Sequence, residues 1–277
     1  MPEEVDYRRN SKEKVIERVL AVAKDLHEHT LGISSDPVAQ FAVVFSALIH
    51  DVDHRGVPNF ILANEEPDIA AKYRNQSIAE QRSIDVAWDI LLEDDFKNLR
   101  RCMFPTEKEF KHFRQLIVNT VMATDIFDKE LGALRKARWQ KCFHPEEFPF
   151  PEVDKRDSFN RKATIVIEHI IQASDVAHTM QHWHVYLKWN ERLFHEMLLA
   201  FKQGRSDKDP TDGWYKGELW FFDNYVIPLA HKLKECGVFG VSSAEYLQYA
   251  TENRDEWERK GQEMCKRMLS NFSELHS

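Results

Sequence analysis

The sequence has few glycines, no long apolar run and no excess of basic residues, and each of these absences excludes a class of protein. Only 9 of the 277 residues are glycine, about half of the usual share, so long helices are favoured over many tight turns between short strands. No run of 18 apolar residues occurs, so this chain is not expected to span a membrane by itself. The formal net charge of −8 argues against a nucleic-acid partner, because such proteins usually carry a basic face.

The four cysteines are widely spaced and include no Cys-x-x-Cys pair: Cys102, Cys142, Cys236 and Cys265. This spacing indicates reduced thiols and excludes both a disulfide framework and a zinc ribbon. The N-terminal segment lacks the apolar core of a signal peptide. We therefore expect a cytoplasmic protein, or the cytoplasmic part of a longer membrane protein.

Apolar residues recur at helical spacing along the chain, and strand-like alternation is scarce, so we predict an all-α fold with a single compact multi-helix domain. Asp36 and Pro37 predict the N-cap and first residue of a helix that is apolar nearly all round and hence buried. Residues 143–157 are rich in proline and acid and predict a surface loop. The other helices are expected at about 11–24, 60–71, 77–93, 106–123, 158–178, 180–203, 215–235 and 243–275.

The sharpest local feature is His50-Asp51-Val52-Asp53-His54 at the end of that apolar helix. Imidazole nitrogen and carboxylate oxygen suit zinc and related ions, and an adjacent His-Asp pair lets the carboxylate bridge to a second ion. His54 lies one turn further on and could orient a ligand or a bound water. The alternative is a polar helix cap on the surface.

Two further helix ends carry carboxylates after apolar runs. Asp175, in SDVAH (174–178), is expected to be buried, and a buried carboxylate is costly unless it is paired or binds a metal. Asp125 follows Thr124 in a similar position. We infer that the end at Asp175 and the end at His50-Asp51 share one ion. Capping of the following helices is the alternative for both residues.

These motifs resemble those of the class I 3′,5′-cyclic-nucleotide phosphodiesterases. FSALIHDVDHRGVPN (45–59) resembles the family's HD-x-x-H-x-G-x-x-N signature, and similar segments follow in order from about residue 36 to 260. The resemblance implies zinc ligation by His50, bridging to magnesium or manganese by Asp51, and a supporting role for His54. Through RNQSIAEQ (74–81), MATDIF (122–127) and QASDVAH (172–178), it implies Glu80 and Asp125 near the second ion and Asp175 as the last zinc ligand.

The resemblance also covers the aromatic stretch ELWFFDNYVIPL (218–229), which otherwise reads as core or as a wall for a planar base. There it implies Phe221 as a clamp on the base, with Glu218 at the position of the family's base-binding glutamine. The sequences of residues 174–194 and 236–243 are most similar to those of algal or protist members of the family. In such members the domain often lies beside a nucleotide cyclase. A flanking cyclase or regulatory domain is therefore expected.

One family motif is missing from the sequence. The family's H-N-x-x-H supplies a general acid and one more zinc ligand, whereas residues 1–30 offer only His27 and His29 at another spacing. Either this is a truncated piece or the domain has lost these groups. Residues 1–35 are accordingly interpreted as an atypical N-terminal helix and loop, and 36–277 as the catalytic domain.

The function implied by the resemblance is hydrolysis of cAMP, cGMP or both to the 5′-monophosphate by a two-metal mechanism, in cyclic-nucleotide signalling. Two alternatives remain open. The missing histidines and Glu218 would suit an impaired nucleotide-binding or regulatory module. A phosphohydrolase acting on another phosphoester would share the metal residues.

Overall fold

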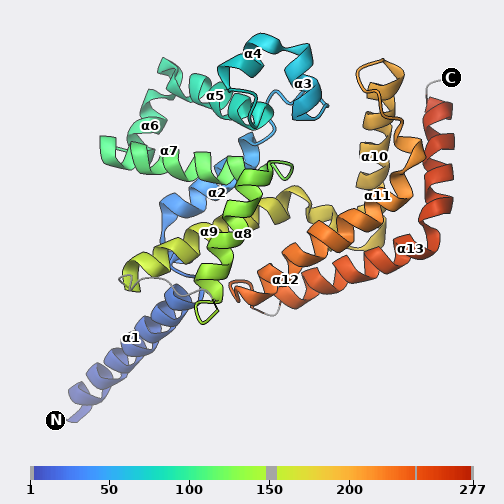
Figure 1. Cartoon of the computed structure of the whole chain (residues 1–277). Coiled ribbons are helices and arrows are strands. Elements are labelled where there is room, and N and C mark those ends of the chain that lie inside the picture. The colour runs from blue at the N-terminus through green and yellow to red at the C-terminus, as the bar shows by residue number, and fades with distance from the viewer. Residues whose placement is uncertain (1–2, 148–154, 241, 276–277) are drawn as a thin grey trace.

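The computed structural model describes residues 3–147, 155–240 and 242–275, and within these ranges every regular element is a helix (Figure 1). The α-helices are α1 (Glu3–His29), α2 (Pro37–Ile49), α3 (Asn59–Glu65), α4 (Pro67–Lys72), α5 (Ile78–Leu92), α6 (Lys97–Met103), α7 (Glu107–Val121), α8 (Lys129–Phe143), α9 (Lys155–Asp175), α10 (Trp183–Lys202), α11 (Trp214–Phe221), α12 (Ile227–Glu235) and α13 (Ser242–Leu275). Short 3-10 turns and one π-helix, η6 (Phe222–Val226), connect them. The all-α prediction is confirmed.

Side chains that cap the helices explain several of their starting points. Asp36 accepts hydrogen bonds from the backbone N–H groups of Val38 (3.0 Å) and Ala39 (3.1 Å), with Pro37 at the first position of α2, as the sequence predicts. Thr106 and Glu109 form a reciprocal capping box at the start of α7. These bonds satisfy N–H groups that have no partner within the helix.

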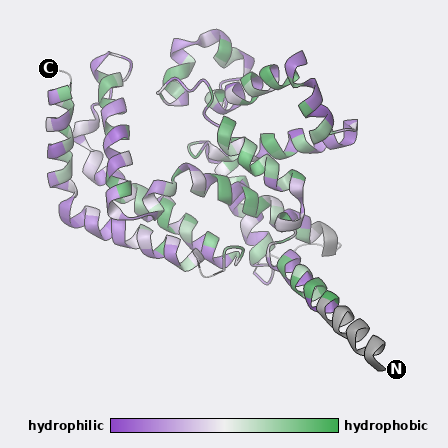
Figure 2. Ribbon diagram, turned by 180° about the vertical axis from the view of Figure 1, so that it is seen from behind, coloured by the Kyte–Doolittle hydropathy of each residue, from purple (hydrophilic) through white to green (hydrophobic). Residues whose placement is uncertain are grey.

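The apolar side chains of these helices form three buried clusters. One joins α2, α5 and α7 around Phe113 and Ile117. A second joins the end of α9 to α10–α13 around Tyr186 and Trp257. A third lies between α3, α4 and α5, and Ala200 of α10 belongs to it, so segments more than 100 residues apart in the sequence pack together. Figure 2 shows hydrophobic residues along the helix faces that meet in the body of the molecule.

The expectation that α2 is buried nearly all round was wrong. Ala39, Ala42, Ser46 and Ile49 are buried, but Phe41, Val44 and Leu48 on another face are 42%, 67% and 76% exposed. The helix α1 projects from the body, so it does not cover this face (Figure 1). It also runs from Glu3 to His29, beyond the expected 11–24.

Other boundaries differ for local reasons. The helix expected at 60–71 is divided at Glu66, because Pro67 starts α4. The helix α8 fills 129–143, where no helix was expected, and α9 already begins at Lys155; residues 148–154 of the expected loop lie outside the described residues. All four cysteines are free. None of the described helices has the length and apolar character needed to cross a membrane.

Candidate metal centre and active site

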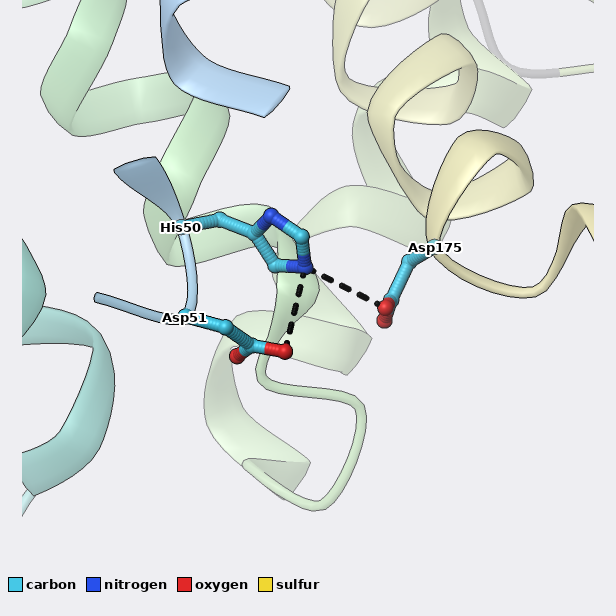
Figure 3. A group of neighbouring side chains, drawn as sticks. All are labelled: His50, Asp51 and Asp175. Atoms are coloured by element: carbon cyan, nitrogen blue, oxygen red, sulfur yellow. Dashed lines mark hydrogen bonds and ion pairs between the residues drawn. The ribbon is translucent and has the colours of Figure 1, made fainter. Parts of the chain in front are cut away.

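Two helix ends that are far apart in the sequence meet in one cluster. His50 and Asp51 follow the last turn of α2, and Asp175 is the last residue of α9, 125 positions after His50. The Nε2 atom of His50 lies 3.4 Å from Oδ2 of Asp51 and 3.3 Å from Oδ1 of Asp175 (Figure 3). One donor atom from each residue lies within 4.8 Å of the others, so the three could share one cation.

The orientation of His50 suits metal binding. Its Nδ1 atom lies 2.9 Å from the carbonyl oxygen of Ala47, one turn earlier in α2. Donation from Nδ1–H to this carbonyl leaves the lone pair on Nε2, which faces both carboxylates, and metal-binding histidines are usually oriented in this way. The backbone of α2 therefore sets both the position and the tautomer of the imidazole.

The electrostatics of the cluster favour a positive charge at Nε2. Hydrogen bonding to Asp175, and then to Asp51, raises the pKa of His50 to about 10. The His50 side chain in turn lowers the pKa of Asp51. One nitrogen and two carboxylate oxygens form a donor set that fits a divalent ion such as zinc, whose catalytic sites often have three protein ligands.

A second polar cluster lies around Asn59, the first residue of α3. Its Nδ2 donates to Oε2 of Glu80 (3.0 Å) and approaches Oδ2 of Asp125 (3.5 Å), while its Oδ1 accepts from the backbone N–H of Ala79 (2.9 Å). Ser77 also donates to Oδ2 of Asp125 at 2.7 Å. Burial and the nearby Asp125 raise the pKa of Glu80, and the bond from Asn59 opposes this rise.

His54 links the two clusters electrostatically, since its charge acts on both Asp51 and Glu80. Its Nδ1 accepts from the backbone N–H of Gly56 at 3.2 Å. Gly56 has a φ of 69°, and a Cβ there would meet Glu196 at 3.1 Å, so glycine suits this turn. Asp53, by contrast, accepts a hydrogen bond from Arg82 at 2.9 Å and so stabilises the turn.

A buried cation, the guanidinium group of Arg135, fixes the backbone of the loop at Asp125. Arg135 of α8 donates to the carbonyl oxygens of Asp125 (3.0 Å) and Met122 (3.4 Å). The Asp125 side chain is buried, and its Oδ1 accepts from the backbone N–H groups of Phe127 and Asp128. Thr124 donates to the Val121 carbonyl (2.8 Å) and closes the preceding helix. Asp125 is therefore firmly positioned.

The two residues implied in base binding lie on α11. Oε2 of Glu218 accepts from the buried hydroxyl of Tyr186 at 2.8 Å, and Asn190 also hydrogen-bonds to the carboxyl. Burial raises the pKa of Glu218 to about 7, against the effect of these two bonds. Phe221, one turn further on, stacks on Tyr225 with ring centroids 5.3 Å apart.

The structure thus brings His50, Asp51 and Asp175 together, and places Glu80 with Asp125 around Asn59. Asp175 is exposed, so the expectation that it is buried was wrong, and no side-chain cap is found on the turn that follows it. His27 contacts Ser35 and Phe159 and is not part of the metal cluster. Sequence reasoning missed Asn59, although it is the last letter of the signature motif.

Comparison with known proteins identifies the family to which the fold belongs. A family model described as 3′5′-cyclic nucleotide phosphodiesterase matches residues 19–237. The chain is 28% identical over 171 residues to a probable 3′,5′-cyclic-AMP phosphodiesterase, pde-4, of Caenorhabditis elegans, covering 61% of this chain and 23% of that protein. It is 26% identical over 166 residues to the mouse dual specificity calcium/calmodulin-dependent 3′,5′-cyclic nucleotide phosphodiesterase 1C, covering 59% of this chain and 20% of the relative. The chain thus spans less than a quarter of these relatives.

The fold also matches solved structures. The phosphodiesterase domain of the Salpingoeca rosetta rhodopsin phosphodiesterase superposes with a TM-score of 0.64 at 22% identity, covering 89% of this chain and 75% of that one. A second structure, of the phosphodiesterase domain of the RhoPDE fusion protein from the same choanoflagellate, gives 0.62 at 21% identity, over 84% and 71%. Since the family model matches well over half of the chain, the chain belongs to the 3′,5′-cyclic nucleotide phosphodiesterase family.

Proposed function

We propose that this chain hydrolyses a 3′,5′-cyclic nucleotide, cAMP, cGMP or both, to the 5′-monophosphate with two divalent ions. The observation that carries the proposal is the cluster of His50, Asp51 and Asp175, found in a chain that matches the phosphodiesterase family. Carboxylate and imidazole ligands fit zinc at this position, and magnesium or manganese suits an additional site made of carboxylates and water.

The residues divide into three roles in this proposal. His50, Asp51 and Asp175 would hold the zinc, with Asp51 also facing the second ion. Glu80 and Asp125 would hold water around that ion, because both carboxylates lie beside Nδ2 of Asn59 and Glu80 also lies near the charge of His54. Phe221 and Glu218 would contact the base.

The reaction adds water across the P–O3′ bond. The water oxygen bonds to phosphorus and releases a proton, the P–O3′ bond breaks, and O3′ takes up a proton. Bound divalent ions would supply positive charge that stabilises the phosphodiester's developing charge and lowers the pKa of water. The protein's part is to fix the carboxylates, through α2, α9 and the Asn59 bonds, before the substrate arrives.

Glu218 supports recognition of a base despite its carboxyl group. A carboxyl with a pKa of about 7 is protonated in a large fraction of molecules at neutral pH. In that form it offers both a donor and an acceptor, as a glutamine amide does. This would let Glu218 bond to a purine edge.

The test is to incubate the purified chain with zinc and either magnesium or manganese, supply cAMP and cGMP separately, and measure 5′-monophosphate by chromatography. Asp175→Asn is expected to lose bound zinc, measured by elemental analysis, and to lose turnover at least 10²-fold, because it removes one of three ligands. Asp212→Asn removes an exposed carboxylate elsewhere and should behave as wild type. Full activity in Asp175→Asn would disprove the proposed site.

The same experiment separates the alternatives. Binding of cyclic nucleotide without turnover would support an impaired regulatory module. Turnover of another phosphoester alone would support a different phosphohydrolase. For the setting, we propose a reducing, cytoplasmic compartment on the ground of the four free cysteines, with a cyclase or regulatory domain as the candidate neighbour.

A further inference from the structure

Two consecutive helices near the N-terminus expose large apolar side chains. On α2, Phe41, Val44 and Leu48 recur at intervals of three and four residues and form one exposed face, the α2 stripe. On the described part of α1, five apolar side chains are 52–67% exposed and also lie on one face, the α1 stripe; they are Ile16, Val19, Leu20, Val22 and Leu26 (Figure 2). Exposed apolar surface of this extent marks an interaction site.

The polar face of α1 argues against a membrane as the partner. The charged residues described on this helix are mixed in sign, with Glu17, Asp25 and Glu28 against Arg18 and Lys24. A helix that lies on a membrane surface usually has a polar face rich in lysine and arginine. Charges of alternating sign are instead typical of a helix face that stays in water. We therefore expect the α1 stripe to meet a polypeptide.

The junction between the two helices directs α1 away from its own α2. The ring of His27 stacks on Phe159 of α9 with ring centroids 5.5 Å apart, and its Nδ1 lies 2.5 Å from Oγ of Ser35. Gly32, with a φ of 76°, donates its backbone N–H to the His27 carbonyl at 2.7 Å. Folding α1 back onto α2 of the same chain would break these contacts. The projecting direction instead leaves both stripes open to a second molecule (Figure 1).

The two stripes match each other in length and spacing. Counted outwards from the junction, Leu26 and Val19 lie seven residues apart on α1, and Phe41 and Leu48 lie seven residues apart on α2. Both helices rise about 1.5 Å per residue, so in an antiparallel pair Leu26 can face Phe41 while Val19 faces Leu48. The chain therefore carries a complement to each of its own stripes.

Pairing of α1 with a second α1 would use this surface less well. The apolar spacing of α1 covers only residues 15–26, less than two heptads, and Arg8, Arg9 and Lys12 precede it. A coiled coil is indicated only by a pattern sustained over about three or four heptads. The α2 stripe would also stay in water. Docking of α1 on the α2 stripe of a second copy covers both stripes at once.

The size of the surface suits a dimer of this kind. Burial of one Val, Leu, Ile or Phe side chain removes about 60–120 Å² of apolar surface from water. The eight side chains of the two stripes are about 60% exposed on average, so two copies would bury roughly 600–1,200 Å² of apolar surface. Because a little over half of an interface is non-polar, the whole contact comes to about 1,000–2,000 Å², as in stable protein pairs.

We propose that two copies of this chain form a dimer in which α1 of each copy packs antiparallel on the α2 stripe of the other. A twofold axis relates the copies, so the contact occurs twice and all four stripes are covered. Since α2 leads directly into His50 and Asp51, the second copy would lie on the helix that positions these candidate metal ligands. The dimer goes beyond the proposed function and does not depend on it.

The first experiment is analytical ultracentrifugation of the purified full chain over a range of concentrations. Wild type should sediment at twice the mass of one chain. Val22→Asp and Val44→Asp each place a charge in both copies of the contact and should raise the dimer dissociation constant at least about 10²-fold. Both side chains are exposed in the single chain, so circular dichroism should show unchanged helicity. Ala21→Asp places the same charge on the polar face of α1 and should behave as wild type.

The second experiment identifies the helices that pair. A chain carrying only Val19→Cys is mixed with a chain carrying only Leu48→Cys, and disulfides formed under mild oxidation are located by mass spectrometry of the joined peptides. A disulfide between positions 19 and 48 of different chains should form, because the two side chains face each other closely enough. Ala21→Cys mixed with Leu48→Cys should not form this bond.

Each other outcome would overturn the dimer. Wild type that stays monomeric at every concentration would do so, as would a dimer that persists in both Val22→Asp and Val44→Asp. A disulfide that forms only when Val19→Cys and Leu48→Cys lie in the same chain would show that α1 closes onto its own α2. Binding of monomeric wild type to vesicles of phosphatidylcholine and phosphatidylserine, lost in Val22→Asp, would identify a membrane surface instead. None of these results bears on the proposed function, because turnover and zinc content are measured separately.

Discussion

Glu218 is the residue at which the predicted site and the core of the protein meet. Its carboxyl group accepts from Tyr186, which is fully buried, and Asn190 in turn accepts from the indole N–H of Trp214 at 3.1 Å. Burial is the largest influence on the group and raises its pKa from 4.5 to about 7. The same side chain therefore affects stability and base recognition.

The raised pKa of Glu218 predicts a pH dependence of stability. Between pH 4.5 and 7 the folded chain keeps this proton while the unfolded chain releases it, so the free energy of unfolding falls as pH rises. Glu218→Gln abolishes the titration. Relative to this variant, wild type should lose up to about 3 kcal/mol between pH 4.5 and 7, measured by urea unfolding.

The control is Glu263→Gln, which removes an exposed carboxylate from α13. This variant should follow the pH profile of wild type. Parallel profiles for wild type and Glu218→Gln would mean that the carboxyl titrates normally in the folded chain, and the argument that Glu218 acts like a glutamine would lose its basis.

At the scale of elements, the site is built from ends of helices, where side chains are free of helix packing. The metal cluster could be predicted from the sequence for this reason. Histidine and aspartate at the end of an apolar helix have no packing role, so metal binding is the simpler explanation for them. The meeting of His50 with Asp175 follows from the packing of α2 and α9, which local sequence does not encode. The roles of all eight predicted site residues, as ligands or catalysts, stay predictions.

Other elements could not be predicted from local patterns. In α8, charged residues occur all round the helix, so no apolar stripe marks it, and its buried residues are Arg135 and Trp139. The exposed face of α2 looks buried in the sequence because hydrophobicity alone does not reveal which neighbours are present. The π-turn at η6 depends on backbone bonds from residue i to residue i−5. No sequence pattern indicates such bonds here, apart from the nearby Pro228.

Asn59 joins three elements, and its removal should destabilise them together. It donates to Glu80 of α5 and approaches Asp125 after α7, and it accepts from the N–H of Ala79. Asn59→Ala leaves two carboxylates close together without their shared donor. We expect the free energy of unfolding to fall by about 2 kcal/mol, because bonds to charged groups contribute about 1.5–3 kcal/mol each and part of this is regained from water.

The matched control is Asn64→Ala, at the other end of α3. Asn64 is exposed and donates only to the Phe60 carbonyl within its own helix, among the bonds found for its side chain. Chemical denaturation should show a loss below about 0.5 kcal/mol for this variant. Equal losses in the two variants would show that the bonds of Asn59 add nothing beyond ordinary helix propensity.

At the scale of the whole molecule, buried polar groups of α9 join this helix to α8 and α12. Glu168 forms a two-bond pair with Arg138 of α8, at 2.9 and 2.6 Å. The next residue, His169, lies between the Ile165 carbonyl, 2.7 Å from Nδ1, and Lys232 of α12, 3.3 Å from Nε2. Its ring also packs against Trp139. The position of Asp175 at the end of α9 therefore depends on both neighbours.

His169 gives the molecule a pH dependence opposite to that of Glu218. Burial, and then the charge of Lys232, lowers the pKa of His169 from 6.5 to about 4. Between these values the unfolded chain binds a proton that the folded chain refuses, so stability rises with pH across the range in which the Glu218 contribution falls. Each contribution amounts to about 3 kcal/mol at most, so the two nearly cancel between pH 4.5 and 6.5.

This cancellation predicts how the variants combine. Relative to wild type, Glu218→Gln should gain stability as pH rises from 4.5 to 6.5, and His169→Gln should lose it, each by up to about 3 kcal/mol. The double variant should recover the wild-type slope, because Glu218 and His169 lie in separate parts of the core and have no partner in common. His112→Gln, at an exposed site on α7, is the control and should leave the slope unchanged. A double variant whose slope departs from wild type by more than the error of urea unfolding would show that His169 of α9 and Glu218 of α11 are energetically coupled.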